Sequence, residues 1–384
     1  MFQCCYYRTE TLCVLSEKAL REGYIGEGAY DCGSKHLSAS PVPHSLGTFL
    51  AEQESTAPGR ENTSLFGDRD MRYYFAPLEG ITDSIFRSLH SKYFTGVDRY
   101  YTPFLSPTVH RGLTAREARE IPRADTLTYE AVPQLLTKVS EDFLWLTGVC
   151  ADLGYKEVNL NTGCPSGTVT AKGKGSGMLR DLPALEAFLD DIFAKSPLPI
   201  SIKTRIGFYD PDEFPAILEL YNRYPIQELT IHPRIRADFY KAPVKMDAFR
   251  YALEHSKNPL CYNGDLISLK KVDAFRKEFP QIESVMIGRG LVADPGMLCP
   301  GGTDIAAVEA FYDELFAVDT EVFGGTRNAM FRLKENWRHL LCKFEGSEKL
   351  GKKLKKTTDA AEYKAITHEI FQTLPLREEI LPDW

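Results

Sequence analysis

The stretch from residue 157 to residue 205 reads EVNLNTGCPSGTVTAKGKGSGMLRDLPALEAFLDDIFAKSPLPISIKTR, and it contains one complete strand–helix–strand unit. Short apolar runs stand at its two ends, EVNLN and PISIKTR. Between them, Leu182–Ala194 carries apolar residues three and four positions apart, which is the period of an amphipathic helix. A strand, a helix and a second strand in this order predict a parallel sheet covered by helices.

The same alternation continues in both directions from this unit. Apolar or β-branched runs begin near Arg72 (RYYFAP), Val97 (VDRYYTP), Ala131 (AVPQLL), Glu157, Pro199, Glu228 (ELTIHPR), Pro259 (PLCYNG) and Glu283 (ESVMIGRG). Further helices are predicted at Ser140–Leu153, Asp212–Asn222, Met246–His255 and Leu269–Phe279. Eight such repeats over about 230 residues have the size of a (β/α)8 TIM barrel, whereas a doubly wound sheet, the alternative, normally uses fewer strands.

Polar side chains stand at or just after the ends of most of the predicted strands. In a barrel these strand ends meet on one face, and the chemistry of such enzymes collects there. A single polar residue at this position is more often a loop contact, but a set drawn from most strands predicts a convergent pocket. The set is Glu79, Gln134, Asn161, Lys203, His232, Asn263 and Arg289.

Cys164 lies in a glycine- and proline-flanked turn directly after the fourth strand. At the mouth of a barrel this thiol could act as a nucleophile, a metal ligand or a proton donor, and an inert thiol is the plainer alternative. No His, Asp or Cys set with metal spacing surrounds it, so we expect no metal site. The glycine-rich run that follows, with Gly173, Gly175 and Gly177, predicts a mobile lid over the cysteine.

The last strands carry residues suited to a phosphorylated cofactor. Lys203 can compensate an anionic ring or phosphate. Asn263, Gly264 and Asp265 follow the seventh strand, and Gly288 and Arg289 follow the eighth. Barrels commonly bind a phosphate at these two loops, through backbone N–H groups and a cation.

Composition excludes several classes of protein. The chain has 384 residues, 53 acidic against 46 basic, with 43% hydrophobic and 26% charged residues, which is typical of a globular protein. No window approaches the ~20 apolar residues that a membrane helix needs. The nine cysteines follow no repeated spacing and no signal peptide is evident, so we expect a reducing cytoplasm and no disulfides.

The two ends of the chain differ from the barrel. Residues 1–70 lack periodicity, and we expect a poorly ordered extension or a mis-called start, with Met71 as the natural start. Residues 304–384 show helical patterning, over Ile305–Val318 and again from Arg327 onward. Between residues 326 and 372, eleven basic residues face six acidic ones, so an acidic protein has a basic end.

Taken together, the quoted segments are similar to those of the bacterial, FMN-dependent tRNA-dihydrouridine synthases. The resemblance extends in order from Met71 to about Leu298 and rests on the segments APLEGITDSIFR (from Ala76), VPQL (Val132), VNLNTGCP (Val158), SIKTRIG (Ser201), IHPRIRADFY (Ile231), NGD (Asn263) and MIGRG (Met286). It implies an FMN-binding barrel over residues 71–303 and a helical tRNA-binding domain over 304–384. It also implies reduction of the uracil 5,6 double bond in tRNA with FMN and NADPH or NADH.

The resemblance further implies roles for individual residues. Cys164 would be the proton donor. Four residues at the start of the helical domain would contact RNA, namely Arg327, Lys334, Trp337 and Arg338. The expected cofactor-binding residues are Pro77, Leu78, Glu79, Gln134, Lys203, His232, Asn263, Gly264, Asp265, Gly288 and Arg289. The family usually carries a small residue in place of Glu79, and often a lysine pair before the valine where Gly167 and Thr168 precede Val169. These differences leave the subfamily and the tRNA position open.

Two other functions remain as alternatives. A small-molecule flavin reductase of the dihydroorotate or dihydropyrimidine type could use the same barrel, but it would not need a basic helical end. An RNA-binding protein without catalysis would need neither flavin nor Cys164. We expect a monomer that acts on tRNA in the cytoplasm.

Overall fold

The computed structural model describes residues 71–382. The segment 1–70, for which the sequence predicts a poorly ordered extension or a mis-called start, lies outside the described residues. Residues 71–106 and 116–382 belong to one compact unit. Residues 107–115 are grouped apart from it and make a short loop, in which Gly112 N donates to Thr108 Oγ1 at 2.9 Å.

The compact unit is built on one sheet of nine parallel strands, in the order β3-β2-β1-β9-β8-β7-β6-β5-β4. The two ends of this order, β3 and β4, are consecutive pieces of the chain, so the sheet closes on itself as a barrel. The strands are β1 (Arg72–Phe75), β2 (Arg99–Tyr101), β3 (Ala131–Val132), β4 (Gln134–Leu135), β5 (Val158–Thr162), β6 (Ile200–Gly207), β7 (Leu229–Ile235), β8 (Leu260–Tyr262) and β9 (Ser284–Ile287).

The third predicted run, AVPQLL, is divided into β3 and β4 by Pro133. Proline has no N–H to donate to a neighbouring strand, so the hydrogen-bonded ladder is interrupted there. The Pro133 carbonyl still accepts from Asn159 N at 2.8 Å, and Thr102 N donates to Val132 O at 3.0 Å. The eight predicted runs are therefore all present, and the ninth strand arises from this one proline.

The register of the central strands brings polar residues to common levels. Lys203 on β6 pairs with Asn161 on β5 and with Thr230 on β7, and Arg205 on β6 pairs with His232 on β7. Because side chains two apart on a strand share a face, Lys203 and Arg205 point the same way. The carboxyl ends of three neighbouring strands thus present their polar residues on one face of the barrel.

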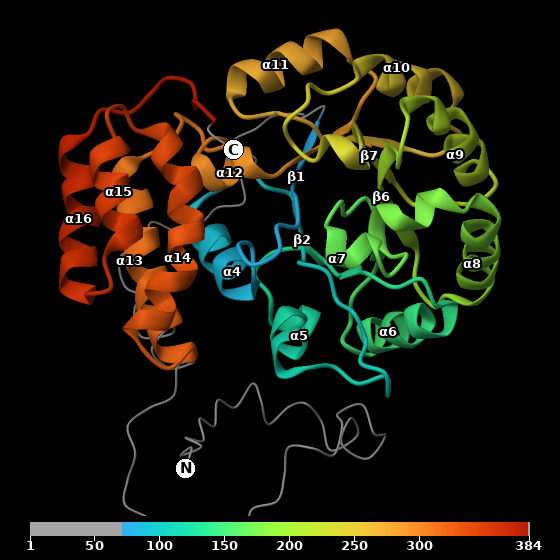
Figure 1. Cartoon of the computed structure of the whole chain (residues 1–384), viewed down its shortest axis with the longest axis horizontal. Coiled ribbons are helices and arrows are strands. Elements are labelled where there is room, and N and C mark those ends of the chain that lie inside the picture. The colour runs from blue at the N-terminus through green and yellow to red at the C-terminus, as the bar shows by residue number, and fades with distance from the viewer. Residues whose placement is uncertain (1–70, 383–384) are drawn as a thin grey trace, which may run out of the picture. The chain divides into compact units, whose positions relative to one another are not determined.

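Helices surround these strands, as Figure 1 shows. The five helices predicted for the barrel are present, and α10 has the predicted bounds; α9 begins at Phe214 because a 3-10 turn takes up Pro211–Glu213. The sequence did not predict α4, whose N-terminus is capped by the Asp83 side chain. The surrounding helices are α4 (Ser84–Tyr93), α6 (Ser140–Asp152), α8 (Leu182–Lys195), α9 (Phe214–Tyr221), α10 (Met246–His255) and α11 (Leu269–Glu278), with shorter α5 (Ala115–Glu120), α7 (Gly167–Thr170) and α12 (Arg289–Ala293).

Four helices follow the barrel and form the bundle coloured orange to red in Figure 1. They are α13 (Ile305–Val322), α14 (Thr326–Leu340), α15 (Glu348–Lys356) and α16 (Ala360–Thr373). Phe311 of α13 packs against α4, with its ring 5.3 Å from that of Phe86, which joins the bundle to the barrel. The predicted TIM barrel followed by C-terminal helices is confirmed.

One observation concerns membranes. Among residues 71–382, no helix combines the length and the apolar character needed to cross a membrane.

Candidate functional site

A pocket opens at the carboxyl ends of the strands, and the empty space in it and at its open mouth amounts to about 970 Å³. Its lining includes Cys164 and all eleven residues that the sequence predicted to bind a cofactor, contributed by the strands, or the loops after them, of seven of the eight predicted runs. The remaining lining residues are Ala76, Pro103, Phe104, Asn161, Gly163, Pro165, Arg205, Arg234, Tyr240, Leu266, Ile267, Met286, Ile287 and Gly290. The structure therefore brings the predicted residues together, while their individual roles remain predictions.

The Cys164 loop is held by its neighbours on both sides. Asn161 Oδ1 accepts from Gly163 N at 3.0 Å and from Cys164 N at 2.9 Å, which forms a tight turn after β5. The Cys164 carbonyl accepts from Ser176 N at 3.1 Å and from Ser176 Oγ at 2.9 Å. The thiol itself is half-buried and lines the pocket.

The second half of the glycine-rich run packs in the interior beside the cysteine loop. Gly175–Arg180 forms a 3-10 helix, and its first five residues are buried. Gly175 has φ +58°, and a Cβ there would lie 2.9 Å from the Cys164 carbonyl oxygen. The glycine is therefore needed for close packing beneath the cysteine, which is a different reason from the mobility that the sequence suggested.

The electrostatics of the Cys164 thiol favour its protonated form. Burial raises the pKa of Cys164 above its ordinary value, and a backbone hydrogen bond from Ser166 and the cations Arg205 and Lys203 offset part of this shift. A thiol with a raised pKa retains its proton at neutral pH. It can then donate that proton more readily than it can act as a thiolate nucleophile.

A chain of amide side chains crosses the base of the pocket. Asn161 Nδ2 donates to Gln134 Oε1 at 2.7 Å, and Gln134 Nε2 donates to Asn159 Oδ1 at 2.8 Å. Asn159 Nδ2 in turn donates to Ser201 Oγ at 2.9 Å. These bonds fix the orientation of the Gln134 amide, so it presents a defined hydrogen-bonding edge to a ligand.

Lys203 and Arg205 bring two cations from β6, and they differ in their partners. Arg205 is 1% exposed and donates to three backbone carbonyls, of Gly163, Ile235 and Phe239, at 2.7–2.9 Å. Within residues 71–382, the Lys203 ammonium has no hydrogen-bond or ion-pair partner, and burial together with Arg205 lowers the pKa of Lys203 to about 8. An unpartnered cation facing a pocket fits an anionic ligand.

His232 is neutral and held in one tautomer by Arg234. The two nitrogens His232 Nε2 and Arg234 Nη1 lie 3.0 Å apart, and because a guanidinium has no acceptor, Nε2 must accept. Burial and the surrounding cations, Arg205 first, lower the pKa of His232 well below its ordinary value. The ring therefore carries its proton on Nδ1, from which it can donate.

Asp265 holds two arginines at the side of the pocket formed by the last loops. It accepts from Arg234 Nη1 and Nη2 at 2.9 and 2.6 Å, and Arg289 Nη2 lies 3.4 Å from its Oδ1. A Cβ on Gly264 would lie 2.7 Å from the Tyr262 hydroxyl, so the chain passes here at a distance that only glycine permits. Close backbone approach beside arginines is the arrangement that binds phosphate.

The charge of the lining supports the same ligand class. Four cations, Lys203, Arg205, Arg234 and Arg289, face two carboxylates, Glu79 and Asp265. Glu79 pairs with Arg116 at 2.7 Å, and burial raises the pKa of Glu79. A pocket with this excess of cations fits a phosphorylated, anionic cofactor.

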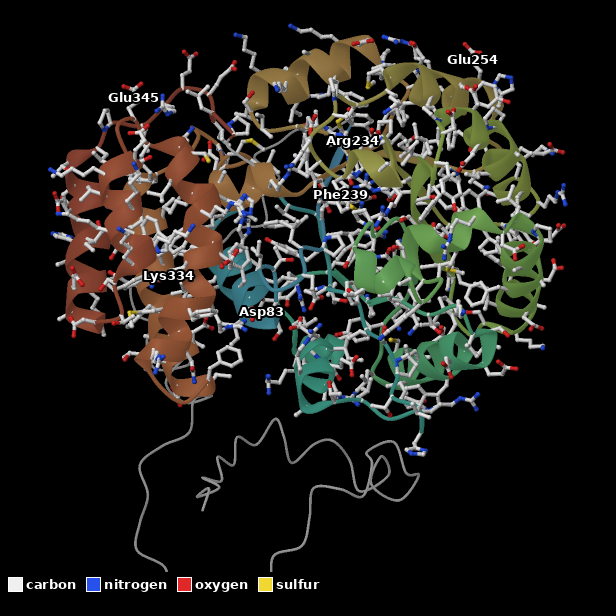
Figure 2. All side chains as sticks on the ribbon, in the orientation of Figure 1. Asp83, Arg234, Phe239, Glu254, Lys334 and Glu345 are labelled. Carbon is white, nitrogen blue, oxygen red and sulfur yellow. The ribbon has the colours of Figure 1, made fainter. Side chains whose placement is uncertain are left out.

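The four residues predicted to contact RNA differ in their placement. Arg327 and Arg338 are exposed on α14, and Lys334 of the same helix is half-buried and donates to the Thr357 carbonyl. Trp337 is 1% exposed, and its Nε1 donates to Tyr363 Oη at 2.7 Å. Trp337 is therefore a core residue of the bundle, a position that favours a structural role over the predicted contact with RNA. Figure 2 labels Lys334 on the same helix.

Several pocket residues were missed by the sequence analysis. Arg205 could have been found, because it lies two positions after Lys203 on a predicted strand and shares its face. Tyr240, whose ring lies 5.3 Å from the Arg205 Cζ and 4.8 Å from that of Arg289, follows a 3-10 turn that gives no periodic signal. In the described part of the chain, no group of three or more His, Cys, Asp or Glu side chains is arranged to hold a metal ion.

Solved structures with a similar chain trace are distant. They include morphinone reductase, with a TM-score of 0.43 and 11% identity over 59% of this chain and 84% of that one. A variant of NCR from Zymomonas mobilis gives a TM-score of 0.41 and 11% identity over 58% and 83%. The fold is therefore assigned from the strand order of this chain and not from these structures.

Sequence comparison is more specific. The chain is 30% identical over 241 residues to a protein named "Probable tRNA-dihydrouridine synthase" in Staphylococcus epidermidis, covering 58% of this chain and 69% of the relative. It is 29% identical to "Probable tRNA-dihydrouridine synthase 2" of Bacillus subtilis, covering 58% and 70%. The family model described as dihydrouridine synthase matches residues 74–372, which includes the barrel and most of the bundle. The chain therefore belongs to the dihydrouridine synthase family of flavin-dependent oxidoreductases.

Proposed function

We propose that this protein reduces the 5,6 double bond of specific uridines in tRNA to 5,6-dihydrouridine, with FMN as its flavin and NADPH or NADH as the reductant. The observation that carries the proposal is the position of Cys164. A half-buried thiol with a raised pKa lines the same pocket as an unpartnered lysine and two arginines held by Asp265. A proton donor beside a site for an anionic ring is what reduction of a uracil requires.

The residues of this pocket would hold the flavin in a defined orientation. Pro77 and Leu78 would offer apolar contact to its ring system, and Gln134 and Lys203 would bind its polar edge. When bound, the reduced flavin supplies a hydride to C6 of the uracil. The ribityl chain and phosphate would be held by residues of the last two loops, Asn263, Gly264, Asp265, Gly288 and Arg289, all of which line the pocket. Glu79 would lie at the rim and His232 beside the ring.

Cys164 completes the reaction at the other carbon. Hydride addition at C6 leaves negative charge at C5 and O4, so C5 must receive a proton. The thiol retains its proton because burial raises the pKa of Cys164, and the Asn161 and Ser176 contacts hold its loop in place. Lys203, whose pKa is lowered to about 8, can match negative charge on the ring system in its ammonium form at neutral pH.

The helices after the barrel would hold the RNA. A uridine within folded tRNA must leave its stack to reach the pocket, which requires grip on the surrounding phosphates. We propose that residues 71–303 bind FMN and residues 304–384 bind tRNA, with Arg327 and Arg338 as exposed contacts and Lys334 in a supporting position. We also propose that the enzyme works as a monomer in the cytoplasm, since one chain carries both the pocket and the basic helices.

The test is to incubate the purified full-length protein with FMN, NADPH and tRNA that lacks the modification, and to map dihydrouridine by position. The proposal predicts dihydrouridine at discrete uridines. If NADPH reduces the bound flavin but no RNA gains dihydrouridine, the proposal fails. A small-molecule reductase of the dihydroorotate or dihydropyrimidine type then becomes the better explanation.

A further inference from the structure

Two arginines and two phenylalanines alternate beside the Cys164 loop, and we call this set the arginine–aromatic ladder. Arg180 Cζ lies 4.9 Å from the centre of the Phe208 ring, and Arg236 Cζ lies 5.5 Å from Phe208 and 5.1 Å from Phe239. All three distances are within the range of cation–π attraction, which extends to about 6 Å. The ladder lies beyond the residues that line the pocket, and Arg236 Nε joins it to the pocket by donating to the Pro165 carbonyl at 3.2 Å.

Local hydrogen bonds and backbone geometry fix the two aromatic members of the ladder, of which Phe208 is half-buried and Phe239 is exposed. The carboxylate of Glu213 accepts from the backbone N–H groups of Phe208, Tyr209 and Asp210 at 2.6–3.1 Å, which fixes the loop after β6. Tyr209 at its tip is 68% exposed. Phe239 is 40% exposed and has φ +49°, a conformation that costs free energy for a residue with a side chain. An exposed ring in a strained backbone conformation, as at Phe239, is unexpected unless something covers it.

The charges of the ladder are not neutralised within the described structure. Among residues 71–382, neither Arg180 nor Arg236 has an ion-pair partner. Three carboxylates of the neighbouring loops are engaged with other groups, since Glu213 and Asp210 accept from backbone N–H groups and Asp238 pairs with Lys245. Arg180 and Arg236 each donate to backbone carbonyls and keep further N–H groups for an external acceptor.

We propose that the ladder binds the single-stranded RNA next to the reacting uridine, with a neighbouring base stacked on Phe239 and a phosphate on Arg236. This inference rests on the proposed function, because a flipped uridine in the pocket places its flanking nucleotides at the pocket rim. Aromatic rings alternating with cations are the combination that binds single strands, since every base can stack and every nucleotide carries a phosphate. The ladder therefore extends the substrate site beyond the pocket along the Cys164 loop; Phe239 is labelled in Figure 2.

The test measures equilibrium binding of a tRNA transcript that the wild-type protein modifies, at several salt concentrations. Phe239→Ala removes a stacking ring whose side chain makes no hydrogen bond, Phe239→Trp keeps a ring, and Arg236→Gln removes the charge. Leu269→Ala, 43% exposed on α11, is the control for Phe239. Arg250→Gln is the control for Arg236, because Arg250 also lies over a phenylalanine ring, 5.8 Å from Phe279, but on the outer helix α10.

The ladder predicts a distinct result for each variant. Phe239→Ala raises Kd for tRNA about tenfold without changing its salt dependence, and Phe239→Trp restores binding to within about twofold. Arg236→Gln raises Kd and lowers the slope of log Kd against log salt by about 0.7, the value for one phosphate of a single strand. Both controls bind tRNA like the wild type, and all variants reduce flavin with NADPH at the wild-type rate.

Two outcomes would overturn the inference, and they differ from failure of the proposed function. If the wild type forms dihydrouridine but Phe239→Ala and Arg236→Gln bind tRNA like their controls, the ladder does not bind RNA and the proposed function stands. If Phe239→Ala slows flavin reduction in proportion to its loss of binding, the ladder only supports the pocket. A wild type that binds no tRNA and forms no dihydrouridine refutes the proposed function and the ladder with it.

Discussion

The barrel mouth and residues 326–372 of the C-terminal helices both carry more basic than acidic side chains, but they hold these charges differently. At the barrel mouth, Arg205 and Arg234 are buried and fixed by backbone carbonyls and by Asp265. On α14, Arg327 and Arg338 are exposed, above a core of aromatic rings in which Trp337 lies 5.1 Å from Tyr312.

This difference indicates two tasks. Fixed charges in a buried site need no rearrangement when charge develops during a reaction, so they suit chemistry and cofactor binding. Exposed, hydrated charges gain mainly from the release of counterions when they meet a phosphate backbone, so they suit weak and salt-sensitive contacts with RNA. The predictions below separate the two regions on this basis.

The largest effect is expected for Cys164→Ala. Removal of a general acid should lower the rate of dihydrouridine formation about 10²- to 10⁴-fold, because hydride can still be supplied but C5 receives no positioned proton. Flavin content and the rate of flavin reduction by NADPH should remain those of the wild type. Rapid-mixing kinetics with and without tRNA checks this, and unchanged tRNA turnover would show that Cys164 is not the donor.

Asp265→Asn is expected to have the next largest effect. It leaves buried Arg234 without its carboxylate, and breaking such a pair costs about 3 kcal/mol of unfolding free energy. Asparagine tolerates the positive φ of 44° at this position, so the backbone need not change. Denaturant unfolding measures the loss, with Asp247→Asn as the control, because Asp247 pairs with Arg250 at the surface. Equal losses in the two variants would contradict a structural role for the buried pair.

Lys203→Met should stabilise the flavin-free protein. Burial lowers the pKa of Lys203 from 10.5 to about 8, so the folded state binds this proton less tightly than the unfolded chain does. The charged side chain therefore costs stability below pH 8, and the cost disappears as the pH rises to about 10.5. Denaturant unfolding should show a gain of about 3 kcal/mol at pH 7 and little or none near pH 10.5, together with weaker flavin binding. A variant less stable than the wild type at pH 7 would mean that Lys203 has an unrecognised partner.

Trp337→Phe should have the smallest effect, and it should be confined to stability. It removes the hydrogen bond to Tyr363 while keeping a ring in the core, so we expect a loss of about 1 kcal/mol. The salt dependence of tRNA binding should not change. Arg338→Gln, one position along the helix, should leave thermal stability unchanged and weaken the salt dependence of tRNA binding. A weakened salt dependence in Trp337→Phe would instead show that Trp337 contributes to RNA binding.

The sequence could predict the barrel mouth because the position of a residue in a strand determines the direction of its side chain. Side chains alternate with period two, and the strands of a barrel end on one face, so Gln134, Lys203 and His232 could be assigned to one pocket without coordinates. Membership of the family and the fold were confirmed. The division of the third strand at Pro133 could also have been predicted, because proline has no N–H, but the sequence analysis predicted eight continuous strands.

The bundle was harder to predict because the elements packed against a helix decide which of its faces is buried. On α14, Trp337 and Arg338 are adjacent in sequence but differ by about 100° around the helix, so one is buried and the other exposed. The elements packed against α14, which are α12, α13, α15 and α16, decide which of its faces is covered. Similarly, Gly175 was assigned to a mobile lid because a sequence does not reveal that the Cys164 carbonyl approaches it closely.

The most direct test of this division of tasks measures two quantities on the same tRNA, Kd and the rate of dihydrouridine formation at saturating tRNA. It compares Cys164→Ala with the double variant Arg327→Gln/Arg338→Gln. We predict that Cys164→Ala loses the rate and keeps Kd, and that the double variant loses affinity and keeps the rate. A double variant that is slow at saturating tRNA, or a Cys164→Ala variant that binds as poorly as it reacts, would contradict the account.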